Sequence, residues 1–250
     1  MGFGKDEPAA MTSTYHAALD SGLGQRLKKI NDVIDAAARK SGRTGKAVRL
    51  VGISKTVTRA SVNAAYAAGL REFGENRVDM ASEKFAENVP ADLILHMVGP
   101  MRADEVNQIA GRFALIHSLG EAELAVALNK RCERNGVVQP VLLQINVGRE
   151  VQKHGCSVEA APQLLEQVLA LDNLDVRGFM TMAPYHAQPE ETRPVFAEMR
   201  SIADNLRAAY PEASLEVLSM GMTNDFAVAV EEGSTMVRVG RAIFHAEHAI

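Results

Sequence analysis

A single lysine closes a short apolar segment of the sequence. Residues 48–55 read Val-Arg-Leu-Val-Gly-Ile-Ser-Lys, and a run of this length and β-branched content is typical of a buried parallel strand. Because a buried ammonium group is costly unless it is paired or neutral, we expect Lys55 to lie at the strand end and to face a cavity. A lysine there can react with a carbonyl group as an amine, forming a Schiff base. The alternative is that Lys55 only marks where the strand meets solvent.

Further polar residues lie at the ends of other predicted strands. Asn76, His96 and Asn146 each follow or belong to a short apolar segment. In a barrel of parallel strands the carboxyl ends meet at one face, so these side chains are expected to converge with Lys55. Each also has an ordinary alternative, because Asn76 could cap a helix, Asn146 could form a turn and His96 could be a hydrogen-bonded core residue.

The loops after the last two predicted strands suit a phosphate group. The segment 219–223 reads Ser-Met-Gly-Met-Thr and the segment 238–241 reads Arg-Val-Gly-Arg, each just before a predicted helix. Such loops bind phosphate in many barrels through backbone N–H groups, and Ser219 and Thr223 would add hydroxyl groups. A simple helix cap and turn explains the segment 219–223 equally well. An amine opposite a phosphate site indicates a phosphorylated carbonyl ligand, either a sugar phosphate, as in aldolases, or pyridoxal 5'-phosphate (PLP).

The whole chain alternates short apolar strands with helical segments. We expect strands over residues 48–55, 72–74, 93–98, 113–117, 140–146, 176–182, 215–218 and 236–239, with a helix over 23–40 before the first strand and helices between the others. Eight strand–helix units with short connections predict an α/β fold, a (β/α)8 TIM barrel, as a single domain over residues 23–250. The alternative, an open doubly wound sheet, lacks its glycine-rich fingerprint after the first strand. Residues 1–22 show no periodicity, and we expect a flexible N-terminal arm.

The composition of the chain favours an ordinary globular protein and argues against several other classes. Apolar residues make up 47% and charged residues 23% of the 250 residues, as in ordinary globular proteins. The net charge of -4 argues against a nucleic-acid partner, which normally requires a basic face. No signal peptide and no apolar stretch of about 18 residues is present, so we expect a cytoplasmic protein without a membrane partner. Cys132 and Cys156 are too few for a disulfide framework or a zinc site.

Seven stretches, in the same order, resemble the YggS/PROSC family of PLP homeostasis proteins. They are Val51–Thr56, Phe73–Asn76, His96–Pro100, Gln144–Val147, Arg177–Met180, Leu218–Thr223 and Gly233–Gly240. The resemblance implies a barrel like the N-terminal domain of alanine racemase, with PLP held as an internal aldimine on Lys55. It implies a cofactor-binding set completed by Asn76, His96, Asn146, Ser219, Met220, Thr223, Arg238, Gly240 and Arg241.

Within this set the resemblance implies distinct roles. Asn76 and Asn146 would line the cofactor ring, and Arg238 would face the pyridine nitrogen. The phosphate would contact Ser219, Thr223 and the backbone of residues 240–241. A guanidinium stays protonated, so the ring nitrogen beside it would accept a hydrogen bond and the ring would be a weak electron sink.

These features favour intracellular PLP homeostasis without strong catalysis. The barrel uses the chain nearly to Phe244, so we expect no second domain of the kind that supplies the opposing tyrosine of a racemase. We expect a monomer whose ligand is PLP and whose candidate recipients are apo forms of PLP-dependent enzymes. The alternatives are a weak amino-acid racemase or other PLP-dependent enzyme, with His96 or Tyr185 as a weak base, an aldolase-like lyase without PLP, and a regulatory protein controlled by PLP occupancy.

The chain departs from the family pattern at several positions. Residues 101–104 read Met-Arg-Ala-Asp where the family often has Leu-Gln followed closely by Asn-Lys, so the role of that loop is open. Val57 replaces a second lysine that many members carry, and His245 replaces a usual glycine. Lys153 matches a lysine that is common in the family.

Overall fold

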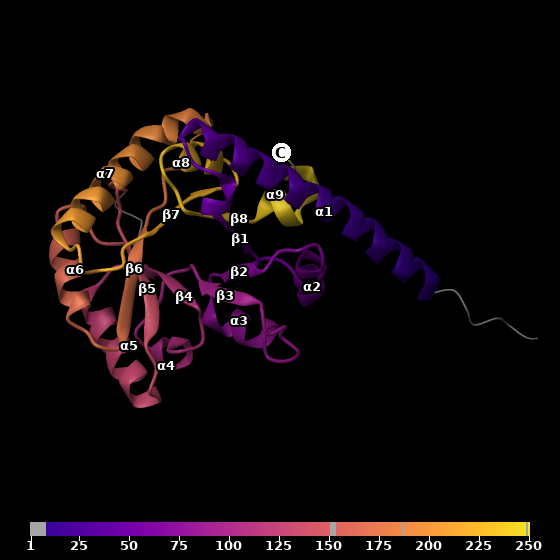
Figure 1. Ribbon diagram of the computed structural model, residues 1–250. Coiled ribbons are helices and arrows are strands. Elements are labelled where there is room, and N and C mark those ends of the chain that lie inside the picture. The colour runs from indigo at the N-terminus through magenta and orange to yellow at the C-terminus, as the bar shows by residue number, and fades with distance from the viewer. Residues whose placement is uncertain (1–8, 151–153, 187, 249) are drawn as a thin grey trace, which may run out of the picture.

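A closed barrel of eight parallel strands organises the molecule (Figure 1). The computed structural model describes residues 9–150, 154–186, 188–248 and 250. Each strand pairs with its neighbours in sequence order, and the last pairs with the first. The strands are β1 (Arg49–Ile53), β2 (Glu72–Glu75), β3 (Ile94–Met97), β4 (Leu115–Leu119), β5 (Gln139–Gln144), β6 (Leu174–Met180), β7 (Val217–Met222) and β8 (Met236–Val239). The predicted TIM barrel is confirmed.

Helices form the outer layer and alternate with the strands. They are α1 (Ala9–Lys40), α2 (Arg59–Ala67), α3 (Val78–Lys84), α4 (Val106–Ile109), α5 (Ala122–Asn135), α6 (Ala161–Leu169), α7 (Arg193–Ala209), α8 (Phe226–Glu231) and α9 (Arg241–Phe244). Local signals set their ends: Thr58 caps α2 by accepting a hydrogen bond from the backbone N–H of Ser61, and Gly69, with a φ of 104°, allows the turn after it.

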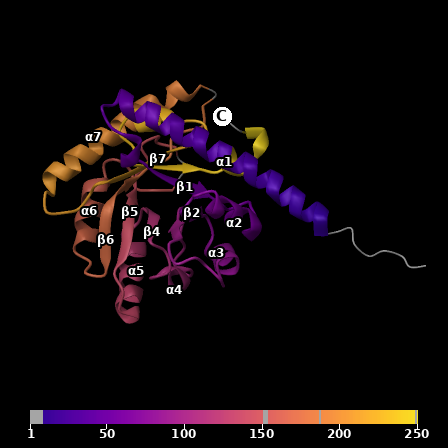
Figure 2. The same ribbon diagram turned by 45° about the vertical axis from the view of Figure 1, so that its right-hand side comes forward.

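The first helix is longer than the sequence predicted. Helix α1 begins at Ala9 rather than Leu23, and its N-terminal part projects away from the barrel (Figures 1 and 2). Its C-terminal half buries Leu27, Ile30 and Ile34 where it packs beside α8 and α9. The arm expected over residues 1–22 therefore falls partly on this helix, while residues 1–8 lie outside the described residues. Its flexibility stays a prediction.

Two kinds of side chain fill the inside of the barrel. A central apolar cluster consists of Val51, Leu115, Leu142, Met180 and Met236. Alternate residues of a strand point to the same side, so the inward positions also hold polar groups, namely Glu72, His96, His117, Ser219 and Arg238. The barrel interior is therefore partly apolar and partly a connected polar region.

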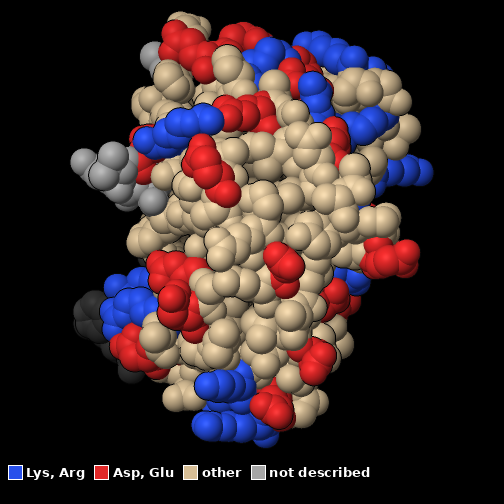
Figure 3. Space-filling model, turned by 90° about the vertical axis from the view of Figure 1, so that its left-hand side faces the viewer, with Lys and Arg blue, Asp and Glu red and all other residues tan. Residues whose placement is uncertain are grey.

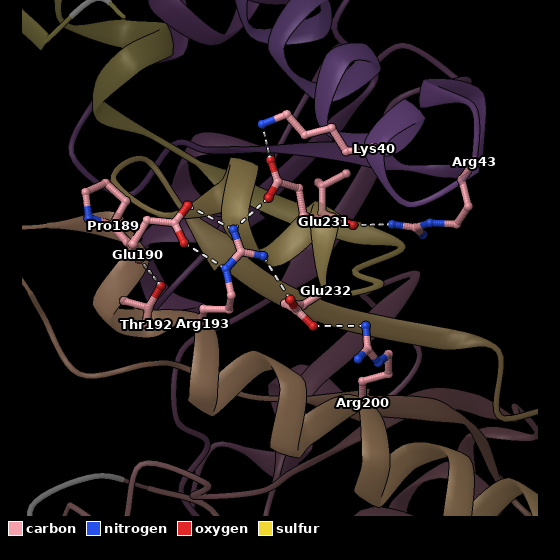
Figure 4. A network of polar contacts seen from close by, with 10 residues as sticks. Lys40, Arg43, Pro189, Glu190, Thr192, Arg193, Arg200, Glu231 and Glu232 are labelled. Atoms are coloured by element: carbon pink, nitrogen blue, oxygen red, sulfur yellow. Dashed lines mark hydrogen bonds and ion pairs between the residues drawn. The ribbon is translucent and has the colours of Figure 1, made fainter.

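Ion pairs on the outside join helices that are distant in sequence (Figure 4). The guanidinium of Arg193, at the start of α7, lies 2.7–2.9 Å from three carboxylates, those of Glu190, Glu231 and Glu232. Lys40 at the end of α1 contacts Glu231, and Arg200 contacts Glu232. This network links α1, α7 and α8.

The outer face formed by α5, α6 and α7 carries few charged groups at its centre (Figure 3). Charges of both signs lie around that area. Val126 on α5 and Leu169 on α6 are exposed. Among the helices that the structure describes, none combines the length and apolar character needed to cross a bilayer.

Candidate functional site

A cavity of about 780 Å³ opens at the carboxyl ends of the strands. Its lining comes from the segments that follow β1, β6, β7 and β8, including Lys55, Thr56, Ala183, Tyr185, Thr223, Asn224, Gly240 and Arg241. The carboxyl end of the strands is where enzymes and binding proteins with this fold place their ligands. The cavity is therefore the candidate functional site.

Lys55 lines this cavity two residues beyond the end of β1. Its side chain is exposed rather than enclosed, so the amine is open to both ligand and solvent. Directly before it, the buried hydroxyl of Ser54 donates a hydrogen bond of 2.7 Å to Glu75 Oε1. Lys84 Nζ on α3 donates to the same Glu75 oxygen at 2.7 Å and to the carbonyl of Ser54 at 2.6 Å. This Ser54–Glu75–Lys84 cluster anchors the backbone from which Lys55 projects.

The loops after β7 and β8 lie side by side at the cavity. The backbone N–H of Gly240 donates a long hydrogen bond of 3.4 Å to Thr223 Oγ1, and Arg241 donates to Asn224 Oδ1 at 3.1 Å. Gly221 has a φ of 93°, and a Cβ there would lie 2.6 Å from Ala229 Cβ. Only glycine suits this close approach of β7 to α8.

A buried guanidinium lies at the base of the cavity. Arg238 is 4% exposed and donates hydrogen bonds to Ser219 Oγ at 2.6 Å and to the carbonyl of Thr181 at 2.9 Å. Burial lowers its pKa to about 10, and the negative charge of Asp225 opposes that shift. At neutral pH the group is therefore a charged donor that also lines the cavity.

The structure brings part of the predicted set together at the cavity. The predicted residues that line it are Lys55, Thr223, Arg238, Gly240 and Arg241. Those that do not are Asn76, His96, Asn146, Ser219 and Met220. Lys153 lies outside the described residues.

Two of the predicted residues sit deeper because β7 is longer than expected. The strand continues to Met222, so Ser219 and Met220 are strand residues and not part of the loop. Ser219 is fully buried, accepts a hydrogen bond from Arg238 and is not among the described residues that line the cavity. Met220 is fully buried in the apolar core.

The other three also lie outside the cavity lining. His96 is fully buried, with Nδ1 3.1 Å from Nε2 of His117. The amide of Asn146 donates to the carbonyl of Glu150 at 2.9 Å and so closes a turn. Asn76 is half-buried, and its backbone lies close to Gly99. A Cβ at position 99 would be only 2.1 Å from the carbonyl oxygen of Asn76. Asn146 and His96 thus have the contacts that their ordinary alternatives predicted, whereas the N-cap residue of α3 is Arg77 and not Asn76.

His117 is a further residue beside the site that was not predicted. It lies in β4 between His96 and Ser219, 3.0 Å from Ser219 Oγ. The signal was available, because the fourth predicted strand ends in His117 and the alternation with buried Leu115 points it inward. Tyr185, His186 and His245 also line the cavity, so the residue that replaces the usual family glycine is part of the site.

Comparisons with known proteins agree with this geometry. Residues 26–248 match the family described as alanine racemase, N-terminal domain. A protein of Aquifex aeolicus named pyridoxal phosphate homeostasis protein is 39% identical over 220 residues, which cover 88% of this chain and 96% of the relative. The Escherichia coli protein of the same name is 32% identical over 229 residues, covering 90% of this chain and 96% of the relative.

A solved structure gives the same result. PipY of Synechococcus elongatus is 32% identical, with 89% of this chain and 99% of PipY covered. The TM-score is 0.80 for PipY without PLP and 0.78 for PipY with PLP bound. The chain therefore belongs to the family of pyridoxal phosphate homeostasis proteins, and its barrel is an alanine racemase N-terminal domain.

Proposed function

We propose that this protein binds PLP reversibly through Lys55 and acts in PLP homeostasis. The observation that carries the proposal is the arrangement of one cavity, in which the exposed amine of Lys55 opens onto the same space as the guanidinium of Arg238 and the loop of Thr223. The names of the curated relatives and the PLP-bound structure of PipY support it.

The residues of the cavity match the chemical groups of PLP. PLP supplies an aldehyde that bonds reversibly to an amine and a ring that withdraws electrons. Lys55 offers the amine, while the Thr223 hydroxyl and the backbone N–H groups of residues 240–241 offer donors for a phosphate. Arg238 offers a permanent positive charge for the ring nitrogen.

The charge of Arg238 favours a carrier over a strong catalyst. A protonated guanidinium donates a hydrogen bond to the ring nitrogen and opposes a second positive charge beside it. The ring then stabilises negative charge weakly, which suits holding the cofactor better than demanding carbanion chemistry. Weak amino-acid racemisation is the second candidate, because Tyr185 lines the cavity with a phenol that can exchange protons.

The exposure of Lys55 also suits transfer of the cofactor to another protein. We propose that the protein acts in the cytoplasm as a monomer and delivers PLP to apo forms of PLP-dependent enzymes. Mixing the PLP-loaded protein with such an apo-enzyme and following the recovery of that enzyme's activity tests the transfer. Recovery no faster than with an equal amount of free PLP contradicts it.

Titration with PLP tests the proposed binding. Wild type is expected to develop the visible absorbance of a PLP–lysine adduct, and Lys55→Ala is expected to develop none. Lys46→Ala is a matched control, because Lys46 precedes β1 at the opposite end of the barrel from the cavity. The same adduct in Lys55→Ala, or no uptake by wild type, contradicts the proposal.

A further inference from the structure

A continuous polar chain crosses the inside of the barrel beneath the cavity. Arg238 Nη1 lies 2.6 Å from Ser219 Oγ, which lies 3.0 Å from His117 Nδ1. His117 Nε2 lies 3.1 Å from His96 Nδ1, and His96 Nε2 lies 3.1 Å from Glu72 Oε2. The five residues come from β8, β7, β4, β3 and β2, so the chain spans the barrel from one wall to the other.

The two ends of this chain lie at opposite ends of the barrel. Glu72 is the first residue of β2 and contacts Arg49, the first residue of β1, at 2.8 Å. Arg238 lines the cavity at the carboxyl ends of the strands. Ser219, His117 and His96 are buried in between, and none of them is among the described residues that line the cavity. The chain therefore connects the cavity to the amino-terminal end of the barrel.

The carboxylate of Glu72 sets the direction of every proton in the chain. The angles at this contact fall short of hydrogen-bond geometry, but a carboxylate oxygen 3.1 Å away favours a proton over a lone pair on His96 Nε2. A neutral His96 with its proton there accepts at Nδ1. His117 must in turn donate from Nε2 and accept at Nδ1. The Ser219 hydroxyl then donates to His117 and keeps its lone pairs for the guanidinium of Arg238.

The charges around these groups are consistent with neutral histidines. Burial lowers the pKa of His96, and the nearby Glu72 opposes this shift. Burial lowers the pKa of His117 further, and electrostatic interactions with its neighbours His96, Arg238 and Arg49 add to this effect. Burial alone would raise the pKa of Glu72, but the contacts with His96 and Arg49 bring it below its ordinary value. At neutral pH the chain thus runs from a charged arginine through two neutral histidines to a charged glutamate.

We propose that Ser219 and His117 are positioning residues that orient Arg238 toward bound PLP, and that the protons of the whole chain run in one direction, from Arg238 to Glu72. Ser219 provides one of the two acceptors given above for the guanidinium, and His117 keeps the Ser219 hydroxyl turned so that its lone pairs face Arg238. This inference rests on the proposed function, because it takes Arg238 as the group that faces the ring nitrogen.

Nitrogen NMR of the histidines tests the direction of the chain without relying on activity. Protein labelled with ¹⁵N in its seven histidines is titrated from about pH 5.5 to pH 8, first alone and then with PLP. Two histidines, assigned with the His96→Gln and His117→Asn variants, are expected to stay neutral with the proton on Nε2. PLP is expected to shift the His117 signals, although His117 does not line the cavity.

Substitution of Ser219 tests the positioning role. Ser219→Ala removes a hydrogen bond to a charged, buried donor, so we expect about tenfold weaker PLP binding and a shifted visible absorption maximum of the bound cofactor. Ser118→Ala is the matched control, because Ser118 is also buried, lies on β4 beside His117 and bonds to the carbonyl of Gly99 instead. It is expected to bind PLP as wild type does. Circular dichroism of the apo-proteins confirms that each variant folds.

The outcomes separate this inference from the proposed function. If wild type takes up no PLP, the proposed function fails. If wild type binds PLP at Lys55 but either histidine carries its proton on Nδ1, the proposed direction is wrong. If Ser219→Ala keeps the wild-type spectrum and affinity, the network is only structural, and the positioning role is overturned.

Discussion

Two cations of different chemistry define the cavity at the scale of single residues. Lys55 is an exposed amine, which can form and release a covalent bond, and Arg238 is a buried guanidinium, which keeps its charge. The division of roles follows from burial, because an exposed lysine remains accessible to other molecules while an arginine tolerates burial as a charged donor. This pairing is the proposed chemical basis for holding PLP without activating it strongly.

Replacing the charge at position 238 is expected to change the cofactor's spectrum. In Arg238→Glu a carboxylate replaces the guanidinium, so the ring nitrogen of bound PLP can hold a proton and the visible absorption maximum shifts. Arg238→Lys, which retains a positive charge but loses the two-armed geometry, is expected to keep the wild-type maximum and bind PLP more weakly. Absorption spectra of the loaded proteins from about pH 6 to pH 9 measure both effects. An unchanged spectrum in Arg238→Glu would separate Arg238 from the ring nitrogen.

Residue types at strand ends made part of the site predictable. Lys55, Thr223, Arg238, Gly240 and Arg241 line the cavity as expected. Ser219 was assigned to a loop because Ser-Met-Gly-Met has no clear strand pattern, and pairing of β7 with β6 and β8 overrides that weak local signal. The strand alternation indicates that His117 points inward, but its contacts could not be predicted because its partners lie 21 and 102 residues away in the chain.

At the scale of elements, a buried ion pair joins β1, β2 and α3 behind Lys55. Glu75 is fully buried and the Lys84 side chain is 8% exposed, and both contact Ser54. Such a pair contributes little net stability when complete, but removing one partner leaves a buried charge unpaired. The three side chains therefore stay in place together, because the buried Glu75 carboxylate depends on the hydrogen bonds from Ser54 and Lys84.

Loss of Lys84 is expected to destabilise the protein strongly. Lys84→Ala leaves the Glu75 carboxylate buried without its cation, which costs about 3–5 kcal/mol of unfolding free energy. Urea denaturation of the apo-protein measures the change. Arg102→Ala breaks an exposed pair with Asp104 and is expected to behave like wild type. Equal effects of the two substitutions would mean that the Glu75 carboxylate finds another partner.

The order of elements could be predicted almost completely, and the ends of some could not. Eight apolar segments of strand length, separated by helical periodicity, are enough to predict the barrel, because parallel strands with short connections have few ways to close. The start of α1 was placed at Leu23 because the sequence before it has no helical periodicity and includes Gly22. The pattern of apolar and polar side chains before Leu23 therefore does not indicate that the helix begins at Ala9.

At the scale of the whole molecule, an ion-pair network ties the first helix to the last third of the barrel (Figure 4). Lys40 and Arg193 both contact Glu231, and Arg193 also contacts Glu232. Pro189 and Thr192, just before α7, line the cavity. The network thus holds together α1, α8 and the segment that forms one side of the cavity.

Removing the centre of this network is expected to lower stability moderately. Arg193→Ala breaks three partly exposed ion pairs, each of which contributes up to about 1 kcal/mol, so we expect a loss of about 1–2 kcal/mol. Thermal unfolding at low and high salt measures it, and salt should reduce the difference from wild type. Lys28→Ala, which breaks one exposed pair within α1, serves as the control. A loss that does not depend on salt would argue against an electrostatic origin.

Acid is expected to weaken the same network. Hydrogen bonds from Lys40 and Arg193 hold the pKa of Glu231 below its ordinary value of 4.5. A carboxylate whose pKa is lowered in the folded state stabilises the fold fully when the pH is above the pKa of the unfolded state. This stabilisation is lost as the pH falls through the lowered pKa of the folded state. Wild type should therefore lose more unfolding free energy between about pH 6 and pH 3 than Glu231→Gln does. Parallel curves for the two proteins in urea would contradict this.

The proposed binding of PLP depends on a covalent bond between the cofactor and one lysine. The most direct measurement is the visible absorption spectrum of the purified protein before and after borohydride reduction, followed by peptide mapping of the reduced adduct. We predict a yellow protein that loses its colour on reduction and carries the label on Lys55. A label on another lysine, or a colourless protein that takes up no added PLP, would contradict the account.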